Sequence, residues 1–148
     1  MTREEFLRNL IKYGNVPYKW GGADAQGLDC SGLTQLILAE IKLDPPGDQS
    51  AQALHDYFIK HGQVLGPADK PDMGDLAFYG RDISKISHVG VCLSEYEMLE
   101  AAGGGPEIKT RQQAEAKNAK VRVSAIKRRS DLLVVVRPDG LPWLNPPA

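Results

Sequence analysis

Hydrophobic positions in the first 60 residues repeat with the period of an amphipathic helix in three segments. These segments cover about residues 1–12, 30–42 and 50–60. The first begins with a capping-box pair, Thr2 and Glu5, and the second follows Asp29, a residue type that commonly caps helices. The pattern therefore predicts three helices in the N-terminal part of the chain.

The pattern changes to short apolar runs after about residue 75, and such runs are typical of β-strands. They occur at residues 75–79, 87–93, 96–101, 120–126 and 132–136. Only Ser94 and Glu95 separate the second run from the third, which predicts an antiparallel hairpin. A short polar helix is expected at about residues 110–117. Helices followed by strands with short turns predict an α+β domain, with the helices on one side of an antiparallel sheet.

The size of the chain indicates one domain. Its 148 residues, 42% of them hydrophobic, are enough for one hydrophobic core and few for two. We therefore interpret residues 1–148 as a single domain that ends in an irregular, proline-rich tail over residues 139–148.

The charge balance argues against a polyanionic partner. The chain has 18 Lys and Arg against 19 Asp and Glu, a formal net charge of -1, so it offers no extended field of one sign to hold nucleic acid. No apolar stretch reaches the roughly 18 residues of a membrane span. The charged start lacks the apolar segment of a signal peptide, which leaves a cytoplasmic protein, delivery by a phage or secretion route, or a leader already removed. The oligomeric state stays open.

The two cysteines lie in different surroundings. Cys30 follows Gly-Leu-Asp and opens the second predicted helix, whereas Cys92 lies inside a strand-like apolar run. A helix N-terminus favours the thiolate through its unpaired N–H groups and its dipole. We therefore expect a reactive thiol at Cys30 and a small buried hydrophobic residue at Cys92. The alternative for Cys30 is a structural thiol at a helix start.

Three histidines could serve as the base for such a thiol. His55 lies within the third predicted helix, and His61 lies at the end of that helix before a glycine. His88 instead starts an apolar strand, where an imidazole is held more firmly than on a solvated helix. Attack of a thiol on a carbonyl needs a base within hydrogen-bond reach. His88 is therefore the preferred base, with a satisfied core histidine as the alternative.

Four short motifs occur in order along the chain. They are Pro17-Tyr-Lys-Trp-Gly-Gly22, Asp29-Cys-Ser-Gly-Leu33, Gly74-Asp-Leu76 and His88-Val-Gly90. Any one of them is weak, but the ordered set over about residues 16–99 resembles the NlpC-type cell-wall peptidase family. Residues 132–138 resemble the closing strand of that family. The resemblance implies a papain-like cysteine peptidase fold with the nucleophilic cysteine at a helix N-terminus.

The resemblance also implies a catalytic site. In that family the cysteine attacks an amide carbonyl, a strand histidine takes its proton, and a third polar residue orients the imidazole. These roles fall on Cys30, His88 and Glu100. The family usually has a histidine at the third position, so Glu100 departs from the commonest pattern, and a strand residue without an orienting role is the alternative. An ionised Glu100 would favour the imidazolium more strongly than a neutral residue would.

The resemblance assigns three further residues to substrate binding. Tyr18 occupies the position whose hydroxyl helps the backbone N–H of Cys30 to bind the oxyanion; its alternative is a loop aromatic packed on Trp20. Asp29 and Ser31 resemble residues that bind the free amino end of a murein stem peptide in some relatives. The alternative for Asp29 is a helix cap with no other role.

The implied function is hydrolysis of an amide in peptidoglycan stem peptides, between γ-D-glutamate and a diamino acid, through a thioester acyl-enzyme. Two alternatives stay open. One is a papain-like amidase, acyltransferase or toxin that acts on a non-murein amide. The other is a catalytically degenerate domain that binds murein. The chain has neither the short paired spacings of zinc ligands nor a phosphate-binding glycine loop, so no metal and no cofactor is implied.

Overall fold

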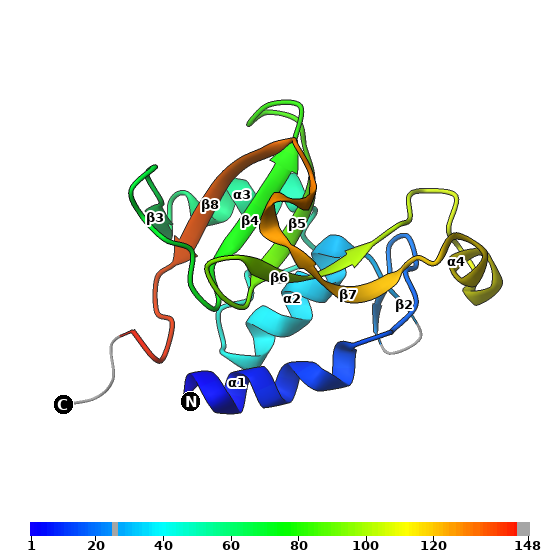
Figure 1. Cartoon of the computed structure of the whole chain (residues 1–148), viewed down its shortest axis with the longest axis horizontal. Helices are drawn as coiled ribbons and strands as arrows, with labels where there is room; N and C mark the ends of the chain where they lie inside the picture. The colour runs from blue at the N-terminus through cyan, green and yellow to red at the C-terminus, as the bar shows by residue number, and fades with distance from the viewer. Residues whose placement is uncertain (25–26, 145–148) are drawn as a thin grey trace.

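The computed structural model describes residues 1–24 and 27–144. It consists of a six-stranded antiparallel sheet with helices packed against it, as Figure 1 shows. The helical elements are α1 (Arg3–Leu10), η1 (Ile11–Tyr13), α2 (Cys30–Glu40), α3 (Ala51–Phe58), α4 (Arg111–Lys117) and η2 (Ile126–Arg128). The strands are β1 (Ala23–Asp24), β2 (Gly27–Leu28), β3 (Gly62–Val64), β4 (Leu76–Gly80), β5 (Ile86–Cys92), β6 (Glu97–Ala102), β7 (Lys120–Ala125) and β8 (Leu132–Pro138).

The large sheet has the strand order β3-β8-β4-β5-β6-β7, and each neighbouring pair is antiparallel. The predicted hairpin is confirmed, because β5 and β6 pair with Val91 opposite Leu99. Continuing this register places Glu100 across from Gly90. Since side chains alternate between the two faces of a strand, Glu100 and His88 lie on the same face, offset by two residues.

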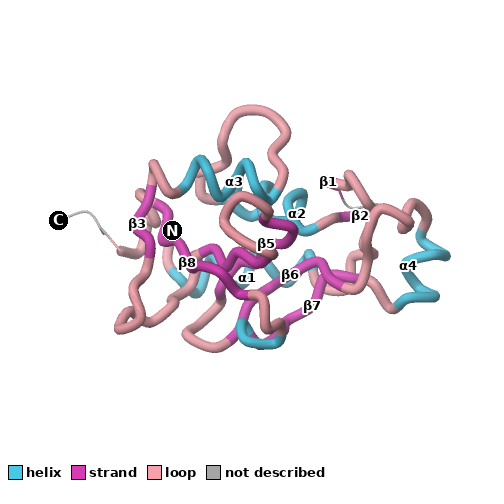
Figure 2. The backbone as a smooth tube through the Cα atoms, turned by 90° about the horizontal axis from the view of Figure 1, so that it is seen from above, coloured by secondary structure: helices cyan, strands magenta, loops and turns pink. Residues whose placement is uncertain are grey.

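Helices α2 and α3 lie along one side of the sheet, which is visible from above in Figure 2. The main core lies between these helices and the sheet and includes Phe78, Val89 and Val91. A smaller core on the other face includes Tyr79 and Met98. Strands β4 and β5 are therefore covered on both faces, which explains why they read as continuous apolar runs rather than as alternating patterns. The predicted α+β architecture is confirmed.

Helix α2 is the central helix, and Cys30 is its first residue. Its side chains Leu33 and Ile37 are at most 1% exposed, and burying a side chain of this size stabilises the fold by roughly 1.5–3 kcal/mol. Asp29 is the N-cap, and its Oδ1 accepts the N–H of Gly32 at 2.7 Å. The predicted cap is confirmed, and the packed helix fixes the cysteine relative to the sheet.

Helix α1 begins as predicted but buries a narrower face. Thr2 and Glu5 form the capping box, with distances of 3.1 and 2.9 Å. Phe6 and Leu10 are buried, whereas Ile11, which has the same apolar character, is 73% exposed. The helix is an outer layer of the domain, so only one edge of its apolar stripe contacts the core.

Two segments differ from the sequence prediction. Strand β3 is not indicated by the sequence pattern, because it has three partly or fully exposed residues that pair with β8 at the edge of the sheet. The tail is irregular as expected, but it is anchored: Leu141 is 1% exposed, and the ring of Trp143 lies 4.8 Å from that of Phe6. Residues 145–148 of the predicted tail lie outside the described residues.

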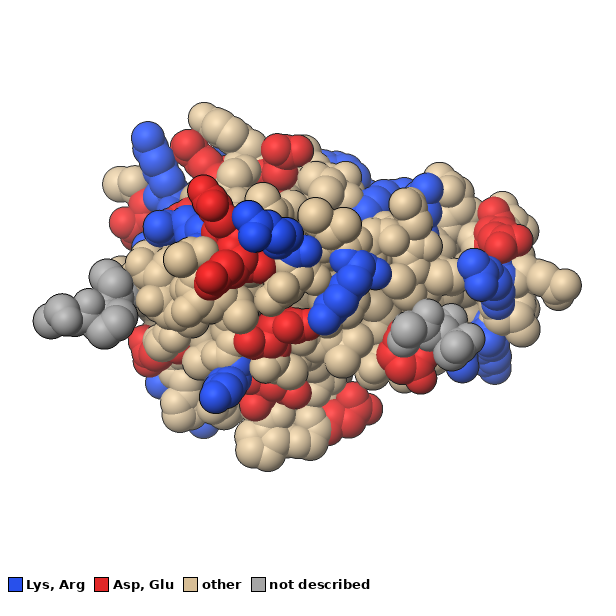
Figure 3. All heavy atoms as spheres, turned by 90° about the horizontal axis from the view of Figure 1, so that it is seen from below, with Lys and Arg blue, Asp and Glu red and all other residues tan. Residues whose placement is uncertain are grey.

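The surface carries a mixture of charges. On the face seen in Figure 3, Lys and Arg lie interspersed with Asp and Glu, as expected for a net charge of -1. Within residues 1–24 and 27–144, no helix has both the length and the apolar character needed to cross a membrane.

Candidate active site

A cleft of about 750 Å³ opens where the N-terminus of α2 meets β5. This volume is typical of sites that bind small molecules or peptide segments. Five of the residues singled out in the sequence line the cleft: Tyr18, Asp29, Cys30, Ser31 and His88. The sixth, Glu100, is fully buried and contacts His88. The fold therefore brings all six residues together.

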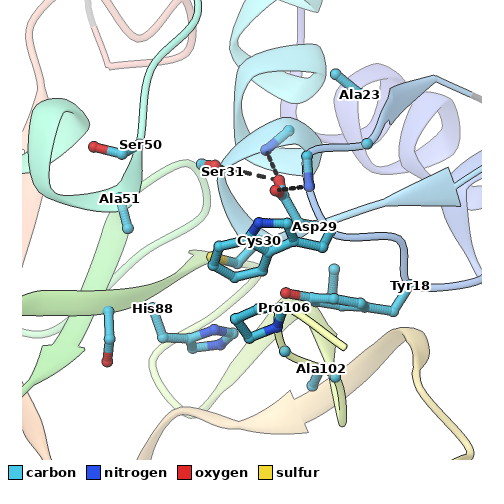
Figure 4. A pocket seen from close by; sticks show the side chains of 18 of the residues that line it. Tyr18, Ala23, Asp29, Cys30, Ser31, Ser50, Ala51, His88, Ala102 and Pro106 are labelled. Atoms are coloured by element: carbon cyan, nitrogen blue, oxygen red, sulfur yellow. Dashed lines mark hydrogen bonds between the residues drawn. The ribbon is translucent and has the colours of Figure 1, made fainter. Parts of the chain in front are cut away.

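Cys30 and His88 come to the cleft from different layers, one from the start of α2 and the other from β5. The Cys30 sulfur accepts a hydrogen bond from the backbone N–H of Val89, the residue after His88. Figure 4 shows the sulfur and the imidazole facing the same part of the cleft. A nucleophile and its base need this proximity.

The imidazole of His88 is held by a buried carboxylate. Its Nε2 lies 2.7 Å from Oε1 of Glu100, and the Glu100 side chain is 0% exposed. Burial alone would raise the pKa of Glu100, but hydrogen bonds from His88, Arg128 and Ser124 lower it to about 2. An ionised carboxylate only accepts hydrogen bonds, so Nε2 carries the proton of the neutral ring and donates it. Nδ1 is then the unprotonated nitrogen, which can accept a proton.

Burial changes the expectation for the thiol. It raises the pKa of Cys30 to about 11, and the charge of Asp29 adds to this effect. The backbone N–H groups of Val89, Ser31 and Cys30 itself lower the pKa, which is the predicted direction for a helix N-terminus. Because burial outweighs these groups, the pKa of Cys30 is raised overall, and the resting cysteine is a neutral thiol near neutral pH.

Tyr18 is buried at the side of the cleft, and its hydroxyl points into it (Figure 4). Its ring packs against Gly104, where an added Cβ would lie only 2.3 Å from the ring. Burial, with the nearby charge of Asp29, raises the pKa of Tyr18, so the hydroxyl stays protonated and can donate a hydrogen bond. A glycine at position 104 is therefore needed to let the Tyr18 ring reach this position.

Asp29 ties the N-terminal loop to α2. Its carboxylate accepts hydrogen bonds from the N–H of Gly21 at 2.8 Å, the N–H of Gly32 at 2.7 Å and the hydroxyl of Ser31 at 3.2 Å, which Figure 4 draws as dashed lines. The approach is close, because a Cβ on Gly32 would lie 2.0 Å from the carbonyl oxygen of Gly22. Asp29 therefore has a structural role at the cleft, whether or not it also contacts substrate.

The other histidines and the second cysteine lie elsewhere. His55 packs edge-on to Phe78 inside the domain, and His61 stacks on Tyr57 with ring centroids 4.2 Å apart. Cys92 is a free cysteine with 0% exposure, as predicted for a small buried hydrophobic residue. Among the described residues, no group of three or more His, Cys, Asp and Glu is placed to hold a metal ion.

The comparison with known families agrees with this geometry. A model described as "NlpC/P60 family" matches residues 14–127, which is more than half of the chain. The chain belongs to the NlpC/P60 family. The family predicted from the ordered motifs is therefore confirmed.

Two relatives illustrate the sequence similarity of this NlpC/P60 domain. It is 31% identical over 109 residues to the γ-D-glutamyl-L-lysine dipeptidyl-peptidase of Bacillus subtilis (strain 168), covering 72% of this chain and 34% of that protein. It is 29% identical over 97 residues to the probable endopeptidase p60 of Listeria grayi, covering 66% of this chain and 17% of that protein. The chain thus spans about a third of the length of the first relative and about a sixth of the length of the second.

Solved structures confirm the papain-like fold. The NlpC/p60 domain of the peptidoglycan hydrolase SagA superposes with a TM-score of 0.66 at 20% identity, covering 92% of this chain and 98% of that one. The peptidoglycan hydrolase RipB of Mycobacterium tuberculosis gives a TM-score of 0.66 at 27% identity, covering 91% and 63%. RipD of the same organism, described as a non-catalytic NlpC/p60 domain protein, gives 0.65 at 23%, covering 91% and 95%.

One residue of the site was not found from the sequence of this NlpC/P60 domain. Arg128 lines the cleft and binds Glu100 twice: its Nε donates to Oε2 at 2.9 Å and its Nη2 to Oε1 at 3.0 Å. In the sequence it is the middle of the run Lys127-Arg128-Arg129, which is typical of a solvated surface. The only signal for it was the position of this run, directly after the apolar segment at 120–126.

Proposed function

We propose that this NlpC/P60 domain is a cysteine endopeptidase that hydrolyses an amide bond in the stem peptides of peptidoglycan. The observation that carries the proposal is the 2.7 Å hydrogen bond between His88 and Glu100, because it holds the imidazole in the tautomer that can take the proton of Cys30. The name of the peptidoglycan hydrolase RipB supports the substrate class, and that of the Bacillus subtilis enzyme supports cleavage after γ-D-glutamate.

The reaction begins from the neutral thiol. Nδ1 of His88 takes the thiol proton as the Cys30 sulfur forms a bond to the amide carbonyl carbon, so the imidazolium appears together with the oxyanion. The backbone N–H of Cys30 and the hydroxyl of Tyr18 are the donors for this oxyanion. The imidazolium then gives its proton to the leaving amine as the C–N bond breaks. Water, deprotonated by His88, hydrolyses the remaining thioester and releases the thiol.

The intact pair of nucleophile and base favours this function over a domain that only binds murein. A binding module has no need of an oriented imidazole, yet His88 is fixed by a fully buried carboxylate that is costly to desolvate without a partner. The desolvation of this carboxylate is explained if its function is to hold the imidazole in place while His88 accepts and returns a proton. For the same reason the residues of the site fit other papain-like amidases, which differ in substrate rather than in chemistry.

Digestion of purified sacculi tests the proposal. Cys30→Ala should reduce the release of peptide fragments, measured by mass spectrometry, by at least about 10³-fold, because it removes the nucleophile. Cys92→Ala is the matched control and should digest murein at the wild-type rate. Release by the Cys30→Ala variant would overturn the proposal. Digestion of an unrelated amide panel, with no action on murein, would overturn the substrate class alone.

A further inference from the structure

The proposed catalytic centre contains a second charge, that of Arg128, which the mechanism above does not use. The guanidinium of Arg128 binds both oxygens of Glu100, while Oε1 of the same carboxylate binds His88. Arg128 comes from η2, 28 residues further along the chain than Glu100 on β6. Its side chain is 37% exposed toward the cleft, whereas that of Glu100 is 0% exposed. Arg128 is thus the cation that compensates this buried carboxylate.

We propose that Arg128 is a positioning residue whose charge cancels that of Glu100, so that the two side chains together present a net-neutral hydrogen-bond acceptor to His88. A lone glutamate would act on the imidazole as a full negative charge, whereas the residue usually found at this position is neutral. The Glu100–Arg128 pair keeps the carboxylate geometry and removes most of its field. The link to catalysis rests on the proposed function, but the test reads the thiol directly.

The pair predicts opposite effects for its two members. Without Arg128, the uncompensated carboxylate stabilises the imidazolium form of His88. Without the charge of Glu100, the remaining guanidinium destabilises that form. An uncompensated charge within about 4–6 Å commonly moves a titration midpoint by about 1–3 pH units. A residue that only braces the fold gives no such reversal of sign.

The other charged and titratable groups near His88 do not disturb this prediction. Among the described residues they are the Cys30 thiol from α2, the Tyr79 phenol from β4, Arg129 directly after η2, and Asp131 before β8. Arg129 and Asp131 neutralise each other through hydrogen bonds of 2.8 and 2.6 Å. Burial raises the pKa of Tyr79, so this residue stays neutral. The net charge next to the imidazole therefore depends on Arg128 and Glu100.

The experiment measures the rate of Cys30 alkylation by iodoacetamide against pH in the full chain. The reactive form is the thiolate–imidazolium pair, which has the same number of protons as the resting thiol–imidazole pair. The rate rises with pH while the pair loses its first proton, which is the acid limb of the profile, and then reaches a plateau. Stabilising the imidazolium therefore raises both the pH at the midpoint of the acid limb and the plateau rate. For Arg128→Met we expect a midpoint at least about 1 unit higher and a plateau about tenfold higher. For Glu100→Gln we expect both to fall by similar amounts.

The double variant Glu100→Gln/Arg128→Met restores a neutral acceptor, so its profile should return to within a few tenths of a unit of wild type. Arg129→Met is the matched control: it removes a neighbouring cleft arginine that pairs with a different carboxylate, and it should move the limb much less than Arg128→Met. Shifts of the same sign in both single variants, or equal shifts for the two arginines, would overturn the inference.

Labelling of buried Cys92 reports any variant that unfolds. If Arg128→Met unfolds, the downward shift of Glu100→Gln and its reversal in the double variant decide the question, and absence of either overturns the inference. Murein digestion by the same proteins separates the two proposals. Shifted profiles in a wild-type domain that cleaves no murein would refute the function alone. Unmoved profiles in a domain that cleaves murein would refute the role of Arg128 alone.

Discussion

Replacing His88 with glutamine should reveal the acidity of the Cys30 thiol without its base. Glutamine has a similar size, and its amide N–H can still donate to the Glu100 carboxylate as Nε2 does in the native protein. It cannot accept a proton near neutral pH. The variant therefore removes proton transfer while it preserves most of the packing around the thiol.

The expected size of the effect comes from burial of the thiol. Burial raises the pKa of Cys30 to about 11, so at pH 7 only about one thiol in 10,000 is ionised in the variant. An ordinary cysteine, with a pKa near 8.5, is ionised to about 3% at the same pH, which is roughly 300 times more. In the wild type, an imidazolium next to the sulfur should lower the pKa of the Cys30 thiol by about 1–3 units. Below the midpoint of the acid limb, the wild type should thus react about 10 to 1,000 times faster than His88→Gln.

The assay is alkylation by iodoacetamide between pH 6 and 10, with both cysteines quantified by peptide mapping. The His88→Gln rate at Cys30 should climb about tenfold per pH unit through pH 10, because only the thiolate reacts. The wild-type rate should instead level off within this range, because the thiolate–imidazolium pair supplies a thiolate before the free thiol ionises. Cys92 should stay unlabelled in both proteins, since it is 0% exposed. A variant that is half ionised near pH 8.5, or that reacts as fast as wild type at pH 6, would refute the account of the thiol given above.

Three further predictions concern the supports of the site. Tyr18→Phe keeps the ring against Gly104 but loses the oxyanion donor, so murein turnover should fall about 10²-fold or more while the alkylation profile of Cys30 is unchanged. In urea denaturation, Asp29→Ala should lower the free energy of unfolding by about 1 kcal/mol, because the helix cap is lost, whereas Asp29→Asn should keep the cap and the wild-type stability. If Asp29→Asn is stable but loses murein turnover, Asp29 also contacts the substrate. Arg137→Met leaves the fully buried Asp75 without the arginine that binds it at 2.9 and 3.0 Å, and should lower the free energy of unfolding by roughly 3 kcal/mol. A decrease below about 1 kcal/mol would count against a stabilising buried pair.

The features that the sequence predicted well are those set by neighbouring residues. The capping box at Thr2 and the N-cap at Asp29 involve residues three apart, and the β5–β6 hairpin depends on a two-residue connection. Each signal names both partners within a short stretch. The motifs around Cys30 and His88 also lie within short stretches, and their order along the chain predicted the family and its fold.

The features that the sequence did not predict depend on approach between distant segments. Arg128 reaches Glu100 only because β7 pairs with β6 and η2 then turns back toward the cleft. The high pKa of Cys30 depends on how tightly the loop and β5 enclose its sulfur, whereas the sequence showed only the helix that lowers it. For the thiol, the local signal of the helix N-terminus was correct in direction. Tertiary burial then supplied a larger effect of its own.

The departure at Glu100, the third position of the proposed catalytic site, is better understood as a change of two residues than of one. A carboxylate with 0% exposure is too costly to desolvate unless a cation accompanies it. With Arg128 present, the pair has no net charge, and Oε1 still accepts the hydrogen bond from His88. The imidazole is therefore in nearly the same electrostatic environment as it would be beside a neutral residue. Either substitution alone would move the imidazole away from that balance, in opposite directions. An acid at this position in another NlpC/P60 domain should therefore be accompanied by a cation on the segment that follows the neighbouring strand. A domain that has the acid without the cation should have an altered acid limb or no activity.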